Sequence, residues 1–412
     1  MIDLRTLRLS DLHGVARLGV DATAGLTDVV EAMHAAIARP DLGLRGAAAA
    51  RTAGITGLVY RSIRGATQLT GAGLGAVLSR RDTEHQRTSA EREAVIAALN
   101  GVLGDHLAAT SNPLAIPMRL HHAGQPLTPS REALSQGVPQ PGSKLLVLVH
   151  GLCMNDLQWT RNGHDHGAML ADALGYTPLY LHYNTGLPIA DNGQRFAALL
   201  EALHAAWPVP VDDITLIGHS MGGLVARSAC QHARRGKQDW LRTLRHLVCM
   251  GSPHHGAPLE RGGRWIDVLL GATPFASPLA RVGRLRSAGI TDLRHGIAHP
   301  VPDGERITAL PRGVRCYAMA ATTAPRKTSH AKTSSGKTTS VNADRGRGAL
   351  HDRWIGDGLV PVASALGHHP DPTRAVGFAQ RRQWIGHGMH HLDLLDHPDV
   401  ADRLLRWLRA GT

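Results

Sequence analysis

One stretch in the middle of the chain constrains the fold more than any other. Ile214, Leu216 and Ile217 form a short apolar run that predicts a strand buried on both faces. The pattern Gly-x-Ser-x-Gly follows at once, with its serine at position 220, and a helical run over 224–234 comes next. Glycine is needed two positions before and after the serine because a Cβ there would collide with neighbouring backbone in a sharp turn. The sequence therefore predicts that Ser220 lies on a strained turn between a strand and a helix.

This turn gives the serine a chemical setting. It lifts the Ser220 hydroxyl clear of the sheet and points the Met221 N–H, with the positive end of the following helix, at any oxyanion formed there. The chain has 46 glycines, so the pentapeptide alone is weak, but its strand-turn-helix setting distinguishes it from a chance match. Gly-His-Ser-Met-Gly-Gly resembles the nucleophile elbow of α/β-hydrolase lipases and esterases. The resemblance implies an α/β-hydrolase fold, with a mostly parallel sheet, flanking helices and a cap, and Ser220 as the nucleophile.

A second segment of the same family follows the first predicted strand of the parallel sheet. Lys-Leu-Leu-Val-Leu-Val-His, residues 144–150, is apolar enough for a fully buried strand and runs directly into Gly151 and Leu152. In the lipases that this segment resembles, the backbone N–H just after His-Gly donates a hydrogen bond to the oxyanion. The resemblance therefore pairs Leu152 with Met221 as the oxyanion hole.

A serine nucleophile needs a histidine that takes its proton and a carboxylate that orients this histidine, here in the chain order serine, acid, histidine. Gly-Asp-Gly-Leu-Val-Pro-Val-Ala-Ser, residues 356–364, resembles the lipase segment that carries the acid. The resemblance implies Asp357 as the acid. Asp352 stays open as a nearby alternative.

Three histidines near the C-terminus compete for the role of the base. His391 stands in a His-Leu-Asp context before a predicted helix over 400–408, which resembles the catalytic-histidine loop of the family. The resemblance implies His391 as the base and leaves His390 and His387 as alternatives. Asp393 falls where some bacterial lipases have a calcium-binding aspartate, but the sequence identifies no second ligand, so no metal is predicted.

A further lipase-like segment is Gly-Ser-Pro-His-His-Gly, residues 251–256, after a predicted strand that begins at Leu247. His254 and His255 are metal-ligating residue types, yet adjacent histidines point apart and no carboxylate partner is identified. Residues of about 259–312 then occupy the place of a lipase cap or lid. The stretch of about 324–348 is rich in Lys, Ser, Thr and Gly, which predicts a mobile surface loop.

Two regions are expected within the 412 residues. Residues 1–112 are predicted to form an N-terminal helical region that no lipase segment matches. Residues 113–412 are predicted to form the catalytic domain, beginning with a short hairpin. The predicted N-terminal helical segments cover 26–38, 46–80 and 89–110, and the predicted helix, strand and helix before the elbow cover 164–174, 177–183 and 191–206.

Composition limits the partners and the compartment. The formal net charge of +12 favours anionic surfaces, while an aromatic content of 4% and the lack of zinc-finger spacing argue against nucleic acid. Four widely spaced cysteines indicate no disulfide framework. Without a recognisable leader or spanning segment, we expect a cytoplasmic protein with possible peripheral association with anionic membrane. The oligomeric state stays open.

These features together predict a serine hydrolase of the lipase or esterase type that acts on a small-molecule or lipid ester and needs no organic cofactor. An acyltransferase or thioesterase would use the same triad, and the sequence leaves that alternative open. A membrane-adsorbing scaffold that keeps the fold without activity is the alternative of a different class.

Overall fold

The computed structural model describes residues 10–21, 90–257, 287–296, 310–326 and 356–409. The predicted segments over 26–38 and 46–80, and most of the predicted cap and basic loop, lie outside these residues, as does Asp352. The chain divides into two units, Met1–Arg92 with Leu107–Ala115, and Glu93–His106 with Ile116–Thr412.

In the smaller unit, the described residues include a helix over 10–21. Within that unit, the Arg92 guanidinium donates to both carboxylate oxygens of Asp11, and both side chains are buried. The Asn112 amide donates to the Gly14 carbonyl at 3.0 Å.

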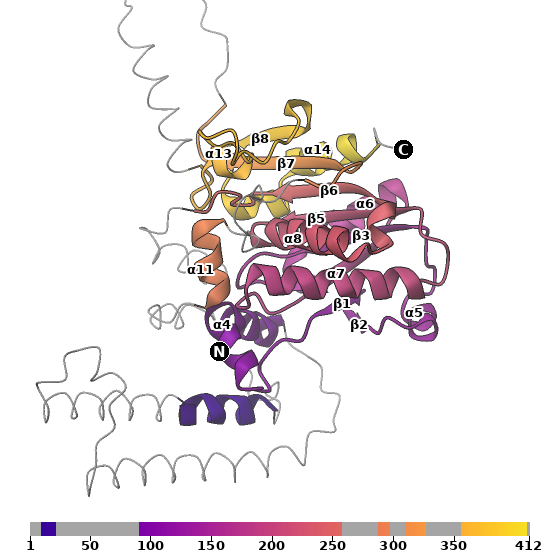
Figure 1. The fold of residues 1–412 in the computed structure, drawn as a ribbon, viewed down its shortest axis with the longest axis vertical. Coiled ribbons are helices and arrows are strands. Elements are labelled where there is room, and N and C mark those ends of the chain that lie inside the picture. The colour runs from indigo at the N-terminus through magenta and orange to yellow at the C-terminus, as the bar shows by residue number, and fades with distance from the viewer. Residues whose placement is uncertain (1–9, 22–89, 258–286, 297–309, 327–355, 410–412) are drawn as a thin grey trace, which may run out of the picture. The chain divides into compact units, whose positions relative to one another are not determined.

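An eight-stranded sheet organises the larger unit, in the order β2-β1-β4-β3-β5-β6-β7-β8 (Figure 1). Strand β1 is antiparallel to β2 and β4, and every other neighbouring pair is parallel. This confirms the predicted mostly parallel sheet. The strands are β1 Arg119–His122, β2 Gln125–Leu127, β3 Lys144–Val149, β4 Thr177–His182, β5 Asp213–His219, β6 Leu244–Met250, β7 Arg315–Thr322 and β8 Gln383–His387.

Helices flank this sheet as the α/β alternation predicts. The α-helices are α4 Ala90–Ala109, α5 Arg131–Gly137, α6 His166–Leu174, α7 Ile189–Ala206, α8 Met221–Gly236, α9 Trp240–Thr243, α11 Ala288–His295, α13 Val362–Ala365 and α14 Pro398–Arg409. The short 3-10 helices are η3 Asp156–Trp159, η6 Gln380–Arg382 and η7 His391–Leu395. Among the described helices, none combines the length and the apolar character that crossing a membrane requires.

Strand β3 explains why both faces of the sheet are covered. Leu145 and Val147 pack into one apolar cluster with residues of α7 and α8, whereas Leu146 and Leu148 pack into another with residues of α6 and α14. Figure 1 shows α7 and α8 together on one face of the sheet. Because side chains alternate along a strand, a continuous apolar run fits only a strand with helices on both sides.

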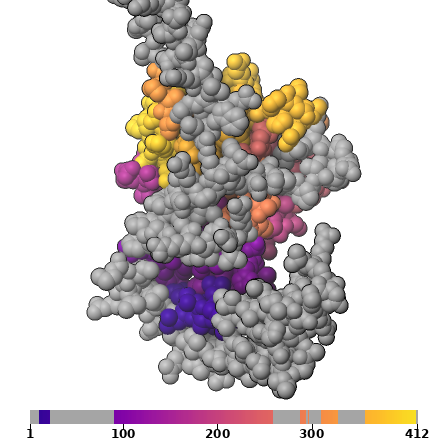
Figure 2. Space-filling model, turned by 90° about the vertical axis from the view of Figure 1, so that its left-hand side faces the viewer, coloured from indigo at the N-terminus to yellow at the C-terminus, as the bar shows by residue number. Residues whose placement is uncertain are grey.

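The sequence analysis missed β8, the edge strand that leads to the segment with the predicted base. Of its residues only Trp384 and Ile385 are large and apolar, so no strand period stands out. β8 pairs in parallel with β7. On the face drawn in Figure 2, orange and yellow surfaces, which belong to the C-terminal part of the chain, adjoin.

The predicted helix over 89–110 is confirmed as α4, and residues 93–106 of it belong to the larger unit. Two glycines let it approach the loops that follow β3 and β4. A Cβ on Gly101 would lie 2.2 Å from Cys153 Sγ, and a Cβ on Gly104 would lie 1.9 Å from Asn184 Oδ1. The Asn184 amide donates to the Gly104 carbonyl at 2.8 Å, so this packing is also hydrogen-bonded.

Candidate active site

Ser220 lies at the turn between β5 and α8. Its φ of 54° and ψ of −122° put a non-glycine residue in a conformation that costs energy and is maintained by its surroundings. The Ser220 N–H donates to the Met250 carbonyl at 2.8 Å, which ties the turn to the end of β6. The side chain is fully buried, and its Oγ makes no hydrogen bond to the described residues.

At Gly218 and Gly222, the two glycines of the pentapeptide, the turn at Ser220 leaves no room for a side chain. A Cβ on Gly218 would lie 2.4 Å from the Gly223 nitrogen, and a Cβ on Gly222 would lie 2.1 Å from the Val149 carbonyl oxygen. Real Cβ atoms do not approach backbone this closely. The steric reason given for the motif therefore holds in the folded chain.

The segment after β3 lies directly beside this turn. A Cβ on Gly151 would lie 3.0 Å from the Ser220 Cβ. Leu152, the next residue in the chain, therefore begins close to the serine. The segment is anchored at both ends, because the Tyr183 hydroxyl donates to the His150 carbonyl at 2.8 Å and the Cys153 N–H donates to Thr185 Oγ1 at 3.1 Å. Leu152 and Met221, the two predicted oxyanion donors, thus belong to segments that meet at Ser220.

His391 is held by Asp357 through two contacts. Its Nδ1 lies 2.7 Å from Asp357 Oδ2, and its backbone N–H donates to the Asp357 carbonyl at 3.1 Å. The second carboxylate oxygen accepts N–H bonds from Leu359 at 2.9 Å and Val360 at 2.8 Å. Both partners are buried, at 1% exposure for His391 and 2% for Asp357. A carboxylate on Nδ1 keeps the proton there in the neutral ring, so Nε2 is the basic nitrogen.

The other two candidates for the base differ from His391 in their burial. His387 and His390 are exposed in the folded chain. His391 instead lies beside the serine turn: a Cβ on Gly251 would be 3.0 Å from its Cε1, and Gly251 follows the residue whose carbonyl binds the Ser220 N–H. Among these three histidines, the structure brings His391 together with the predicted acid.

His219, the neighbour of the serine, keeps a neutral ring against His391. The two ring centroids are 4.7 Å apart, and His219 Nε2 lies 3.2 Å from the His391 carbonyl, to which it donates. Burial, and then the charge of His391, hold the His219 pKa well below its ordinary value of 6.5. His219 therefore adds no second positive charge at the site near neutral pH.

Residues 164–278 match the PGAP1-like alpha/beta domain family. With the elbow between β5 and α8 and the parallel sheet already described, the fold is decided. The chain has an α/β-hydrolase fold.

Several solved structures resemble this α/β-hydrolase, all with TM-scores below 0.5. The mature lipase BlEst2 of Bacillus licheniformis is 18% identical, with a TM-score of 0.42 over 71% of this chain and 97% of that one. EstA of Clostridium botulinum is 15% identical, with a TM-score of 0.36 over 65% and 87%. The RedJ thioesterase of Streptomyces coelicolor is 17% identical, with a TM-score of 0.34 over 68% and 99%. No curated protein matches the chain.

Two further lipase-like segments of this α/β-hydrolase interlock through Ser364. Its Oγ donates to the Gly256 carbonyl at 2.8 Å and accepts from the His255 N–H at 3.1 Å. His254 Nδ1 accepts a hydrogen bond from the buried Arg227 at 2.7 Å. The histidine pair thus helps to fix the loop after β6 to the segment that carries Asp357.

The described part of the predicted cap lies over the elbow. Helix α11 approaches so closely that a Cβ on Gly289 would be 2.1 Å from the Thr185 carbonyl and 3.2 Å from Met221 Cε. The Gly289 N–H donates to the Gly186 carbonyl at 3.0 Å. Residues 258–286, which include the first part of the predicted cap, lie outside the described residues.

Asp393, His254 and His255 are the metal-ligating residue types that the sequence singles out. Asp393 Oδ2 accepts the His390 N–H at 2.7 Å and so begins η7. In the described part of the chain, none of these three residues belongs to a group of metal-ligating side chains. One such group does occur, formed by His121, Asp156 and His182, and the sequence analysis missed it because only the pairing of β1 with β4 brings them together.

Proposed function

We propose that this α/β-hydrolase is a serine hydrolase of carboxylic esters. The observation that carries the proposal is the buried pair of His391 Nδ1 and Asp357 Oδ2, 2.7 Å apart, next to a serine on a strained turn. A serine in this setting has a base within the same site and an acid that fixes the orientation of that base.

The proposed reaction uses the backbone and side chains already described. Ser220 Oγ attacks the acyl carbonyl while His391 Nε2 takes its proton, and the same proton then goes to the leaving alcohol. The N–H groups of Leu152 and Met221 hydrogen-bond the oxyanion that forms during attack. Water, activated by His391, hydrolyses the acyl-enzyme and regenerates the serine.

Asp357 is proposed to act as the residue that orients His391. It accepts hydrogen bonds from His391 and from two backbone N–H groups, which together satisfy a buried carboxylate. The negative charge also stabilises the imidazolium that forms in the transition state.

The substrate class follows from the chemistry of the site and from the names of similar proteins. BlEst2 is described as a lipase and RedJ as a thioesterase, so a carboxylic ester or thioester of a small molecule or lipid is the proposed substrate. Acyl transfer to an alcohol or thiol would use the same acyl-enzyme, and product analysis separates it from hydrolysis.

The test combines labelling with turnover. Wild-type protein should react with a fluorophosphonate probe and cleave p-nitrophenyl esters, tested from acetate to palmitate. Ser220→Ala should lose labelling and about a thousandfold or more of the turnover, because only the attacking oxygen is removed. Ser135→Ala, at an exposed serine of α5, is the matched control and should behave as wild type. Labelling that persists in Ser220→Ala would refute the assignment.

A further inference from the structure

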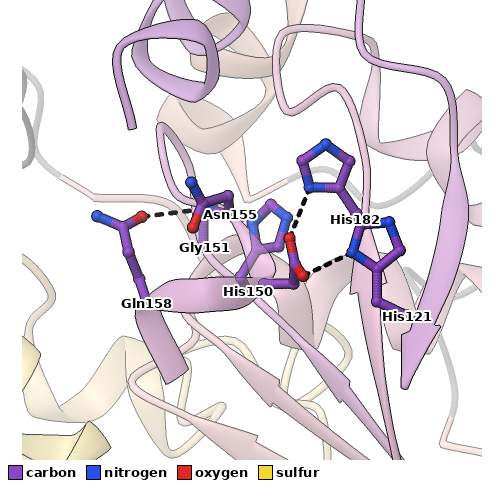
Figure 3. Close-up of polar contacts among 7 residues, drawn as sticks. His121, His150, Gly151, Asn155, Gln158 and His182 are labelled. Atoms are coloured by element: carbon purple, nitrogen blue, oxygen red, sulfur yellow. Dashed lines mark hydrogen bonds and ion pairs between the residues drawn. The ribbon is translucent and has the colours of Figure 1, made fainter. Parts of the chain in front are cut away.

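A second group of polar side chains lies outside the proposed triad. Asp156 receives one histidine on each carboxylate oxygen: His121 Nδ1 lies 2.7 Å from Oδ2, and His182 Nδ1 lies 2.8 Å from Oδ1 (Figure 3). We call these three residues the His-Asp-His cluster. It plays no part in the reaction proposed above.

Sheet topology brings the two histidines together. In the antiparallel pairing of β1 with β4, His121 is opposite Tyr180, and His182 is two residues further along the same strand. Residues two apart on a strand point to the same face, so both imidazoles project to one side of the sheet. Their rings stack with centroids 5.0 Å apart and an interplanar angle of 14°.

Asp156 comes from the segment that also carries a proposed oxyanion donor. It opens η3, four positions after Leu152, and its exposure is 7%. A buried carboxylate is costly unless hydrogen-bonded or paired, and the two imidazoles meet that need. The cluster therefore ties the oxyanion segment to β1 and β4.

We propose that the His-Asp-His cluster binds one divalent transition-metal ion of the Zn²⁺ class. Two imidazole nitrogens and a carboxylate oxygen form a donor set of this kind, and the ligand atoms lie within 4.8 Å of one another. Tetrahedral coordination with bonds of about 2.0–2.2 Å separates neighbouring donors by about 3.3 Å. The two contacts of 2.7 and 2.8 Å between the histidines and Asp156 would lengthen to about this spacing when the ion binds.

A fourth imidazole lies close to the cluster. His150 interacts electrostatically with all three members, and Figure 3 draws its ring in the same view as His121 and His182. Its Nδ1 is bonded to the Gly151 carbonyl at 3.0 Å, whereas its Nε2 is buried and has no hydrogen-bond partner among the described residues. A buried ring nitrogen without a hydrogen-bond partner, on a histidine close enough to interact with the charges of the cluster, is a second observation that points to a ligand here.

The ion would act on the fold of the site and would enter no step of acyl transfer. It would replace the two hydrogen bonds of Asp156 by bonds to the metal and lock the start of η3 to the sheet. Partial exposure of the His121 side chain, at 16%, gives the ion a way in. Metal binding and ester hydrolysis are thus separate properties with separate tests.

The experiment uses the full chain, free of any histidine tag and stripped with a chelator. Isothermal titration with Zn²⁺ should give one tight site per chain, and Co²⁺ should give the visible absorption of a tetrahedral site. His121→Gln, His182→Gln and Asp156→Asn should each weaken the site about a hundredfold or more, since even losing a residue that only supports a ligand costs about 10- to 100-fold.

The matched control is His122→Gln. His122 is the next residue of β1, but its Nδ1 is bonded to the Pro178 carbonyl at 2.9 Å and not to Asp156. This variant should bind Zn²⁺ as tightly as wild type. Ser220→Ala should do so too, which separates failure of this proposal from failure of the proposed hydrolysis.

Two results would overturn the site. One is wild-type protein that takes up no Zn²⁺ at micromolar concentrations, which would leave the cluster as a hydrogen-bonded group only. The other is equal binding by wild type and His121→Gln, because the ion would then sit on other histidines of the 26 in the chain. His121→Gln keeps the bond of His182 to Asp156, and circular dichroism with a melting curve verifies that it is folded.

Discussion

Asp357 holds His391 by its carboxylate and by its backbone carbonyl at the same time. The carboxylate fixes the ring nitrogen that carries the proton, and the carbonyl fixes the backbone on which the ring is mounted. A histidine one position away in the sequence lacks both contacts. Sequence alone could not separate these neighbours by any physical property, since all three histidines offer the same imidazole.

At the residue scale we predict that His391→Ala is as severe as the loss of the serine. Turnover should fall about a thousandfold or more, because residues that act as one unit each abolish most of its effect. His390→Ala and His387→Ala are the controls and should retain much of the rate, since both side chains are exposed. The measurement is kcat/KM on one p-nitrophenyl ester for the three variants. Loss of activity in His390→Ala with an active His391→Ala would contradict the geometry.

Of the proposed triad, only Ser220 follows from a local steric requirement, whereas Asp357 and His391 were inferred from segments that resemble those of lipases. Gly218 and Gly222 indicate the turn at Ser220, and the segment that begins with Gly356 and Asp357 resembles the lipase segment that carries the acid. The His-Asp-His cluster has no such local signature, because its members lie far apart in the chain. Only the pairing of β1 with β4 makes them neighbours, and the order of strands in a sheet cannot be read from the sequence alone.

At the scale of elements, the apolar strands of the parallel sheet were predictable and the edges were less so. β3 and β5 are buried along their length, so their apolar runs stand out. β8 lies at the sheet edge, where polar residues are allowed and the period is lost. Helix α4 was predicted from its apolar spacing, but nothing in that spacing says that its glycines face the loops after β3 and β4.

The contact of α4 with the loop after β3 leads to a prediction about the two elements. Gly101→Val should disturb the oxyanion segment, because a Cβ there would lie 2.2 Å from Cys153 Sγ and 3.0 Å from its Cα. Overpacking of this kind costs about 1–3 kcal/mol of stability. Turnover should fall about tenfold or more with little change in KM, since a misplaced oxyanion donor weakens the transition state more than the bound ester.

The control for this prediction is Gly236→Ala, at the end of α8. A Cβ at Gly236 would meet only the Gln238 Cγ, at 3.7 Å, which is ordinary contact. Helix propensity by itself favours any such replacement of glycine, so a loss confined to Gly101→Val must come from the clash. If Gly101→Val and the control had the same melting temperature and the same kcat, α4 would not press on the oxyanion segment.

At the scale of the whole molecule, charge and buried histidines act together. The chain carries a formal charge of +12 with its 26 histidines neutral, so each histidine that takes a proton adds to a net positive charge. That charge also motivates our proposal of peripheral binding to anionic membrane. Several histidines of the folded sheet and its helices are held neutral by burial, which couples folding to pH.

The last prediction is that the fold loses stability as pH falls from about 6.5 toward 4. Burial lowers the pKa of His166 to about 4, of His246 to about 4 and of His150 to about 3, from an ordinary value of 6.5. Between these values the unfolded chain binds protons that the folded chain does not, so stability rises with pH in this window and falls on acidification. Each such histidine contributes a slope of about 1.4 kcal/mol per pH unit within its own window. Urea midpoints at pH 7.5, 6.5, 5.5 and 4.5 should decline below 6.5, and His246→Gln should decline less steeply than wild type because one titrating group has been removed. A urea midpoint that stays constant down to pH 4.5 would mean that these rings are protonated as readily in the folded chain as in the unfolded one.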